Sequence, residues 1–376
     1  MKIAVNTRLL LKNQLEGIGW FTYESLKRIT QNHKEHQFVF IFDRPYDESF
    51  IFSDNITPLK IGPPARHPIL WYWWFEHSIP KALKKCGADV FVSTDGYGSL
   101  NAQLPSYLVI HDLAFEHFPK HLKSPHRNFM QKYTPKYAHS ATRIGTVSEF
   151  SKEDIAQKYN VAHDKIDVLY NGSNDACNPF SNEEKSEIKS RFTQGQDYFL
   201  FLSAIHPRKN LDNLLKAFDQ FKENNSNQVK LLVAGRKAWN NNGLDEVFNA
   251  MKFKDDVVWT GHLQKTEVGE VLGASLSLVY PSHFEGFGIP ILEAMHVEVP
   301  VITSNVSSMP EVAGDAAILV EPSSVDSIYN ALNAIYKDQN LRFDLVNKGK
   351  EQRQQFSWNK TADKLWDGIN RILPPS

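Results

Sequence analysis

The sequence has few cysteines, no surplus of charge of either sign and no long apolar run, and each shortage excludes a class of protein. Two cysteines, Cys86 and Cys177, cannot form a metal cage by themselves, and so few thiols among 376 residues fit a reducing compartment. There are 42 Lys and Arg residues against 43 Asp and Glu residues, so the net charge is -1. Because proteins that bind polyanions are normally basic, we expect no nucleic-acid partner.

Membrane and export signals are also missing. No stretch approaches 18 uninterrupted apolar residues, so the sequence predicts no membrane-spanning helix. The opening residues, MKIAVNTRLL, run directly into a strand-like segment and lack the apolar core and cleavage site of a signal peptide. We therefore expect a cytoplasmic protein.

Several catalytic signatures are absent as well. No serine occupies a nucleophile elbow, no H-E-x-x-H or Asp-x-Asp motif occurs, and the histidines lack metal-ligand spacing. The sequence therefore predicts a site without metal and without any other cofactor.

What the sequence does contain is an alternation of short apolar runs with amphipathic segments, in both halves of the chain. Continuous apolar runs are typical of parallel strands that helices cover on both faces. The expected strands are 2–6, 38–42, 89–93, 107–110, 143–147, 166–170, 198–203, 229–234, 256–260, 276–280, 299–303 and 317–320. Since 376 residues are long for one core, the pattern predicts an α/β protein with two Rossmann-like parallel-sheet domains.

The expected boundaries are an amino-terminal domain over 1–172, a linker over 173–196, a second domain over 197–356 and a final helix over 357–376. The polar linker includes one short predicted helix, 182–192, and Ser357 is expected to cap the final helix. Open parallel sheets place ligand sites outside the carboxyl ends of their strands, so two such domains facing each other would form a cleft.

The densest candidate for a ligand site is the segment PSHFEGFGIPILE, which follows the apolar run LSLVY. Gly286 and Gly288 permit close approach of the backbone, and Pro290 suits the first turn of a helix. Exposed amides at such a turn would face an anion, and Glu285 and Glu293 would reach ligand atoms beside it. The alternative is an ordinary strand-to-helix turn with two solvated glutamates.

A second candidate is the segment SAIHPRKN, which follows the apolar run YFLFL. Arg208 and Lys209 place two adjacent cations at the end of a strand, which suits a diphosphate, and Asn210 is expected to cap the following helix. The alternative for such a pair is a solvated loop. Gly235-Arg236-Lys237 gives a weaker version of the same signal.

Three smaller features remain open from spacing alone. Gly17 and Gly19 precede an expected helix over 20–30, but the third glycine of a dinucleotide-binding loop is absent. His111 directly follows a predicted strand and could donate to a phosphate or a sugar hydroxyl, or be structural. The aromatic stretch Trp71–Phe75 fits either a buried helix or contact with a membrane interface or an amphiphilic acceptor.

Taken together and in order, these segments resemble the family four glycosyltransferases, retaining nucleotide-sugar-dependent enzymes with the GT-B fold. The likeness runs through GIGWFTYESL, VIHDLAFEHFP, TVSEFSKEDI, VLYNG, PRKNLDNLLKAF, EGFGIPILEAM and TSNVSSMPEVAGDAAILVEP. It implies two domains facing across a cleft and a final helix that crosses back to the amino-terminal domain. Two positions depart from the family pattern: Ser203 stands where some relatives carry arginine, and the segment from His296 to Pro300 lacks the usual glycine.

The resemblance also implies a role for each candidate residue. Glu285 would contact the donor sugar, His111 the transferred sugar and Glu293 the donor ribose. Arg208 and Lys209 would neutralise the donor diphosphate and, with Glu285 and His111, would make up the catalytic group. The implied donor-binding positions are Glu293, Gly286, Phe287, Gly288, Ile289, Gly17, Gly19 and Ser203.

We therefore predict a retaining, metal-independent glycosyltransferase of cell-surface polysaccharide synthesis. Its donor would be a nucleoside-diphosphate sugar, with GDP-mannose favoured and a UDP- or dTDP-sugar left open, and its acceptor a glycan or a lipid-linked glycan. Contact of Trp71–Phe75 with the inner face of the cell membrane is left open. The rival hypotheses are a non-catalytic protein that binds a nucleotide or sugar, and a nucleotide-sugar epimerase, which would need no acceptor.

Overall fold

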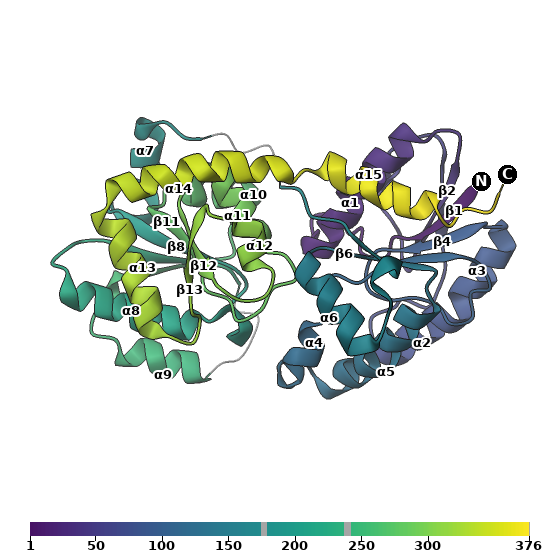
Figure 1. Cartoon of the computed structure of the whole chain (residues 1–376), viewed down its shortest axis with the longest axis horizontal. Coiled ribbons are helices and arrows are strands. Elements are labelled where there is room, and N and C mark those ends of the chain that lie inside the picture. Colours follow the sequence, from purple (N-terminus) through teal and green to yellow (C-terminus); the bar gives the residue numbers. More distant parts are fainter. Residues whose placement is uncertain (174–178, 237–241, 376) are drawn as a thin grey trace. The chain divides into compact units, whose positions relative to one another are not determined.

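The structure is a computed structural model that describes residues 1–173, 179–236 and 242–375. It divides into two compact units, of which the first holds Met1–Gly172 and Ser357–Ser376 and the second holds Ser173–Phe356. Figure 1 traces both units along the chain. Cys177 and Lys237, which the sequence singled out, lie outside the described residues.

The first unit is built on a seven-stranded sheet in the order β3-β2-β1-β4-β5-β6-β7, with every neighbouring pair parallel. Its strands are β1 (Lys2–Asn6), β2 (Gln37–Phe42), β3 (Ile56–Lys60), β4 (Val90–Ser93), β5 (Ser106–Val109), β6 (Arg143–Thr146) and β7 (Ile166–Val168). The sequence predicted all of them except β3. Pro58 cannot donate to the ladder and interrupts the apolar pattern, but β3 tolerates it because β3 is an edge strand.

Helices cover both faces of this sheet (Figure 1). They are α1 (Gly17–Asn32), α2 (Pro68–Trp73), α3 (Ile79–Cys86), α4 (Ala114–His117), α5 (Ser124–Ser140), α6 (Glu149–Tyr159) and α15 (Trp358–Asn370). Neighbouring residues of β5 show the two faces, because side chains alternate along a strand. Tyr107 meets Gly368 of α15 on one face, whereas Leu108 packs with residues of α5 and α6 on the other.

The final helix, α15, belongs to the first unit and packs beside α1 (Figure 1). The ring centroid of Trp358 lies 6.4 Å from that of Phe21, and Thr361 donates a hydrogen bond to the carbonyl of Tyr170. Gly172 lies against the backbone of Trp358, where a Cβ would clash. Only glycine therefore fits at position 172, because the returning chain packs against it at Trp358.

The second unit holds a six-stranded parallel sheet in the order β10-β9-β8-β11-β12-β13. Its strands, all predicted from the sequence, are β8 (Tyr198–Leu202), β9 (Lys230–Ala234), β10 (Val257–Gly261), β11 (Ser277–Tyr280), β12 (Val301–Ser304) and β13 (Ala317–Val320). Its helices are α7 (Asn182–Thr193), α8 (Leu211–Asn224), α9 (Asn242–Ala250), α10 (Lys265–Gly273), α11 (Ile289–His296), α12 (Met309–Ala313), α13 (Val325–Lys337) and α14 (Gln339–Gln352).

Much of the segment expected as a linker is part of this second unit. Helix α7 packs on α10, and Phe180 lies against Gly273 at the end of α10. Across the described ranges, no helix is both long and apolar enough to cross a membrane.

Candidate active site in the second unit

The two loops that carry the strongest sequence signals are joined directly to each other. Strands β8 and β11 are parallel neighbours, so the loops that follow them begin at the same edge of the sheet. The amide of His283 donates to the carbonyl of Arg208 at 2.8 Å. The buried side chain of Asn210 donates to the carbonyls of Pro281 and Pro322, at 2.9 and 2.7 Å.

The prediction that Asn210 caps α8 with its side chain is wrong. Asn210 does occupy the position before the helix, but its backbone is left-handed, with φ of 60°, and its side chain makes no capping bond. Its amide instead holds the Arg208-Lys209 loop against the loop that carries Glu285.

Arg208, Lys209 and Glu285, which the sequence placed separately around a ligand, form one charged cluster. The ammonium of Lys209 lies 2.5 Å from Oε1 of Glu285, and Nη1 of Arg208 lies 3.0 Å from Oε2. Lys209 also donates to the hydroxyl of Tyr280 at 2.9 Å, and Arg208 donates to the carbonyl of Phe284. Two cations thus share one carboxylate.

Glu285 is ionised although it is buried, with 7% of its surface exposed. Burial alone would raise its pKa, but the charges of Lys209 and Arg208 outweigh that effect and lower the pKa to about 2. The cluster therefore carries a net charge of plus one from its three side chains. Because the side chains of Arg208 and Lys209 remain 20% and 13% exposed, part of this charge is accessible to an anion.

This pKa predicts how the stability of the fold depends on pH. Ionised Glu285 stabilises the folded state above its unfolded pKa, near 4.5, and this stabilisation is lost as the pH falls toward 2. The fall in the pKa from 4.5 to about 2 corresponds to about 3 kcal/mol of added stability of the folded state at neutral pH. We expect the difference in unfolding free energy between the wild type and Glu285→Gln, measured by chemical denaturation, to be largest above pH 5 and to shrink toward pH 3. A difference that stays constant over this range would contradict the depressed pKa.

The glycine turn after Glu285 is held rigidly by serines of a neighbouring loop. Ser308 Oγ donates to the carbonyls of Glu285 and Phe287, both at 2.9 Å, and the amide of Glu285 donates to Ser307 Oγ at 3.1 Å. Gly288 has φ of 109°, in the left-handed region that favours glycine, and it precedes the first residue of α11. Neither serine was predicted as a functional residue, and the only signal for them was the family-like segment TSNVSSMPEVAGDAAILVEP, which contains both.

Glu293 lies in a different environment from Glu285. It is half-buried in the second turn of α11, and its carboxylate accepts no hydrogen bond from the residues that the structure describes. Burial raises its pKa, and the charge of Lys265 only partly opposes this effect. Glu293 is therefore a half-buried acceptor that a hydroxyl group of a ligand could satisfy.

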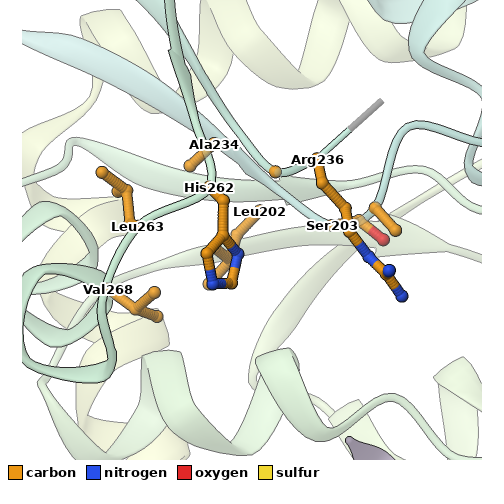
Figure 2. A pocket seen from close by; sticks show the side chains of 9 residues that line it. Leu202, Ser203, Ala234, Arg236, His262, Leu263 and Val268 are labelled. Atoms are coloured by element: carbon orange, nitrogen blue, oxygen red, sulfur yellow. The ribbon is translucent and has the colours of Figure 1, made fainter. Parts of the chain in front are cut away.

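Ser203 lies in a pocket at the ends of β8, β9 and β10, at the start of the loop that carries Arg208 and Lys209. The pocket is lined by Leu202, Ser203, Ala204, Ala234, Gly235, Arg236, His262, Leu263 and Val268. Figure 2 shows the side chains of His262 and Arg236 extending into the same space. Gly235 has φ of 153°, and a Cβ there would collide with the carbonyl of Ser203, so glycine allows the two strand ends to approach. His262 was not singled out in the sequence, where its position after a strand was the only signal.

The remaining candidates, His111, Gly17 and Gly19, lie in the first unit. Gly17 and Gly19 belong to the first turn of α1 rather than to a loop before it, and Gly19 packs tightly on the carbonyl of Leu9. His111 Nε2 lies 2.8 Å from the carbonyl of Thr94, and its ring contacts Phe21 of α1. Burial lowers the pKa of His111, so the imidazole is neutral at neutral pH.

Two Rossmann-like parallel sheets, with a cationic cluster at the strand ends of the second, place a site for an anionic ligand where open parallel sheets bind their ligands. Comparison with known proteins identifies the family. Residues 182–352 match the family described as Glycosyl transferases group 1, and residues 16–176 match Glycosyltransferase Family 4. The chain therefore is a glycosyltransferase and belongs to the group 1 glycosyltransferases, which confirms the predicted family and fold class.

Individual relatives span most of the chain. The protein is 30% identical to O-antigen chain mannosyltransferase B of Escherichia coli, over 70% of both chains. It is 28% identical to O-antigen chain mannosyltransferase RfbU of Salmonella typhimurium, over 71% of both. The fold is similar to the crystal structure of Anabaena HepE in complex with UDP-glucose, with a TM-score of 0.77, 14% identity and coverage of 99% of this chain and 100% of that one.

Proposed function

We propose that this glycosyltransferase transfers a sugar, with mannose from GDP-mannose favoured, to a glycan or lipid-linked glycan in cell-surface polysaccharide synthesis, with retention of configuration. The observation that carries the proposal is the cluster of Arg208, Lys209 and Glu285 at the strand ends of the second unit. The two O-antigen mannosyltransferases among the relatives support the sugar and the kind of product.

The cluster suits the departure of a nucleoside diphosphate. Negative charge grows on the diphosphate as its bond to the sugar breaks, so a cation beside it stabilises the transition state more than the ground state. Arg208 and Lys209 would supply that charge. Glu285, with a pKa of about 2, is ionised at neutral pH and therefore orients the cations and accepts from a sugar hydroxyl instead of donating a proton.

Retention is proposed to proceed without a covalent sugar–enzyme intermediate. The carboxylate of Glu285 is bound to both cations, which lowers its nucleophilicity. The acceptor hydroxyl would then attack the anomeric carbon from the face that the nucleotide leaves.

The pocket of Ser203 and His262 is proposed to hold the nucleobase of the donor. Its volume of about 190 Å³ is smaller than the roughly 300–1,000 Å³ typical of sites that enclose a whole ligand, so it suits one part of a nucleotide sugar. Apolar side chains such as Leu202 and Val268 would face the base, and Arg236 and His262 would contact its polar edge or the adjoining groups.

Activity is expected to need no divalent metal, because Arg208 and Lys209 would supply the positive charge that a metal otherwise brings to a diphosphate. We expect full turnover after treatment with EDTA and removal of the chelate. Loss of turnover that Mg²⁺ or Mn²⁺ restores would contradict this expectation.

Glu293 is expected to contribute to nucleotide affinity. If its carboxylate accepts hydrogen bonds from the donor ribose, Glu293→Ala should weaken nucleotide binding by about 1–3 kcal/mol, the scale of hydrogen bonds to a charged group. Isothermal titration with GDP and UDP measures this change. Glu351→Ala, which removes an exposed carboxylate from α14, is the matched control and should bind normally. Equal affinity in both variants would exclude the ribose contact.

The proposed function is tested with a donor panel. The full chain is incubated with GDP-mannose, UDP-glucose and dTDP-sugars, with and without a polyprenyl-diphosphate-linked glycan, and nucleoside diphosphate release and the anomeric configuration of the product are measured. Acceptor-dependent release with an α-linked product from an α-linked donor is expected. Sugar isomerisation without acceptor would indicate an epimerase, and a rise in melting temperature with GDP, UDP or dTDP but no turnover would indicate a non-catalytic binding protein.

A further inference from the structure

The aromatic stretch Trp71–Phe75 is divided between the core and the surface. Trp74 and Phe75 are fully buried and pack in the core beneath the first sheet. Trp71 is half-buried and donates from its indole to the carbonyl of Ala65 at 2.7 Å. The interpretation as a buried helix therefore holds for Trp74 and Phe75. It does not explain the exposed side chains of Tyr72 and Trp73.

The outer side of α2 exposes an unusual amount of apolar surface. Ile69 is 72% exposed, Trp73 is 55% exposed and Tyr72 is 40% exposed. Within the described residues, seven large apolar side chains are exposed, and these three lie within five consecutive positions. Exposed apolar side chains gathered in this way mark a contact surface more often than scattered ones do.

Basic side chains continue the same exposed stripe. A π-helical turn, Trp74–Ser78, joins α2 to α3, where Lys81, Lys84 and Lys85 are exposed at helical spacing. Residues 68–86 contain a single acid, Glu76, which is 3% exposed and accepts from the amide of Leu100 at 3.0 Å. The stripe thus combines apolar and cationic side chains and shows no exposed carboxylate.

Helix α5 extends this surface. Figure 1 shows α5 next to α2, and the rings of Tyr72 and Tyr133 lie 5.7 Å apart. The exposed ammonium groups of Lys132 and Lys136 lie 5.2 and 5.6 Å from the ring of Tyr133. No acidic residue occurs anywhere in 117–148. This concentration of positive charge stands in a chain whose net charge is -1.

We propose that this aromatic–basic face docks the protein on an anionic lipid bilayer. The face is defined by Ile69, Tyr72, Trp73, Lys81, Lys84, Lys85, Lys132 and Lys136. Trp and Tyr rings favour the boundary between headgroups and acyl chains, while lysines bind the negative headgroups, as in helices that lie in a membrane interface. Neither residues 68–86 nor residues 117–148 expose a carboxylate, so the face is positively charged and favours an anionic bilayer over a neutral one.

The face also begins at the functional edge of the first sheet. Helix α2 follows β3, and Trp71 packs within 5.9 Å of the guanidinium of Arg8, which follows β1. Carboxyl ends of parallel strands carry the ligand sites of such sheets. The docking surface therefore deepens the proposed function, on which this point rests: a lipid-linked acceptor would be presented at the edge where the unit binds it.

The test is sedimentation of the full chain with vesicles. Binding is expected to vesicles of equal parts phosphatidylglycerol and phosphatidylcholine, to weaken as salt is added, and to be absent with phosphatidylcholine alone. Each lysine near an anionic surface changes the partition coefficient about five-fold, so Lys81→Glu, Lys84→Glu and Lys85→Glu together should lower it at least about 100-fold. Lys216→Glu, Lys254→Glu and Lys337→Glu together make the same charge change at exposed sites of the second unit and should bind nearly as the wild type does.

The apolar part of the face has its own pair of variants. Ile69→Ala with Trp73→Ala should weaken partitioning about 10-fold or more, because less apolar area enters the bilayer. Phe343→Ala, which removes a ring that is 70% exposed on α14, should leave it unchanged. Circular dichroism melting checks that all variants fold.

Any of three sedimentation results would overturn the proposal: no sedimentation of the wild type, equal binding to both kinds of vesicle, or an equal loss of binding in the control variants. Self-association without lipid that the face variants abolish would assign the face to a second copy and would also overturn it. Donor turnover without vesicle binding would refute the docking surface alone. Vesicle binding without turnover of any donor would refute the proposed function and leave the docking surface standing.

Discussion

Replacing Lys209 with alanine is expected to lower kcat/KM by about 10²–10³, the range found when one preorganised electrostatic stabiliser is removed. Lys209 is held in place by Glu285 at 2.5 Å and by the hydroxyl of Tyr280 at 2.9 Å, so its charge does not have to be reoriented during the reaction. Without Lys209, the net charge of the cluster would fall from plus one to zero, because only Arg208 and Glu285 would remain. The field on the departing diphosphate would then fall sharply.

Arg208→Ala should act in the same direction, because it serves the same phosphate group. The double variant should lose less than the product of the two single losses, as expected for residues that act as a unit. The control is Lys216→Ala, which removes an exposed ammonium from α8, the helix that follows the loop. Steady-state kinetics with the best donor of the panel measures all four variants. Near-wild-type turnover in both single variants would show that the diphosphate binds elsewhere.

Glu285→Gln should lower kcat by about 10²-fold while leaving GDP and UDP affinity within a few-fold. The amide removes the negative charge that orients both cations and accepts from the sugar, so the transition state loses its alignment. The affinity for the nucleotide is less affected, since the cluster gains one positive charge while its cations become less ordered.

The comparison of kcat with affinity separates this role from a structural one. Titration calorimetry gives the affinity, and the rate of nucleoside diphosphate release at saturating donor gives kcat. A variant that is merely unfolded would lose both in proportion, whereas Glu351→Gln on the surface of α14 should change neither. An unchanged kcat in Glu285→Gln would rule out the assigned role.

Most of both sheets could be predicted from the sequence because buried parallel strands are continuous apolar runs. β3 was missed for the opposite reason: as an edge strand with Pro58 and partly exposed side chains, it carries no such run. Helix α1 begins at Gly17 rather than at residue 20, because packing of the first turn on the 9–15 loop overrides the low helix propensity of glycine.

The residue types of the site could be predicted, but their pairing could not. Arg208 and Glu285 are separated by 77 positions, and only the parallel pairing of β8 with β11 brings their loops together. The sequence treated Glu285 as a group facing a ligand, whereas the structure shows it bound to two cations. Tyr280 was hidden because it is the last residue of a buried strand, where an aromatic residue is ordinarily part of the core.

The return of α15 to the first unit reverses the order in which the two units can be completed during synthesis. Residues 357–376 leave the ribosome only after the whole second unit has been made. Until then the surface of α1 that receives Trp358 and the glycine at position 172 stay uncovered. The second unit can therefore reach its native packing first. Until α15 is made, the amino-terminal unit exposes an apolar surface to which chaperones can bind and through which chains can aggregate.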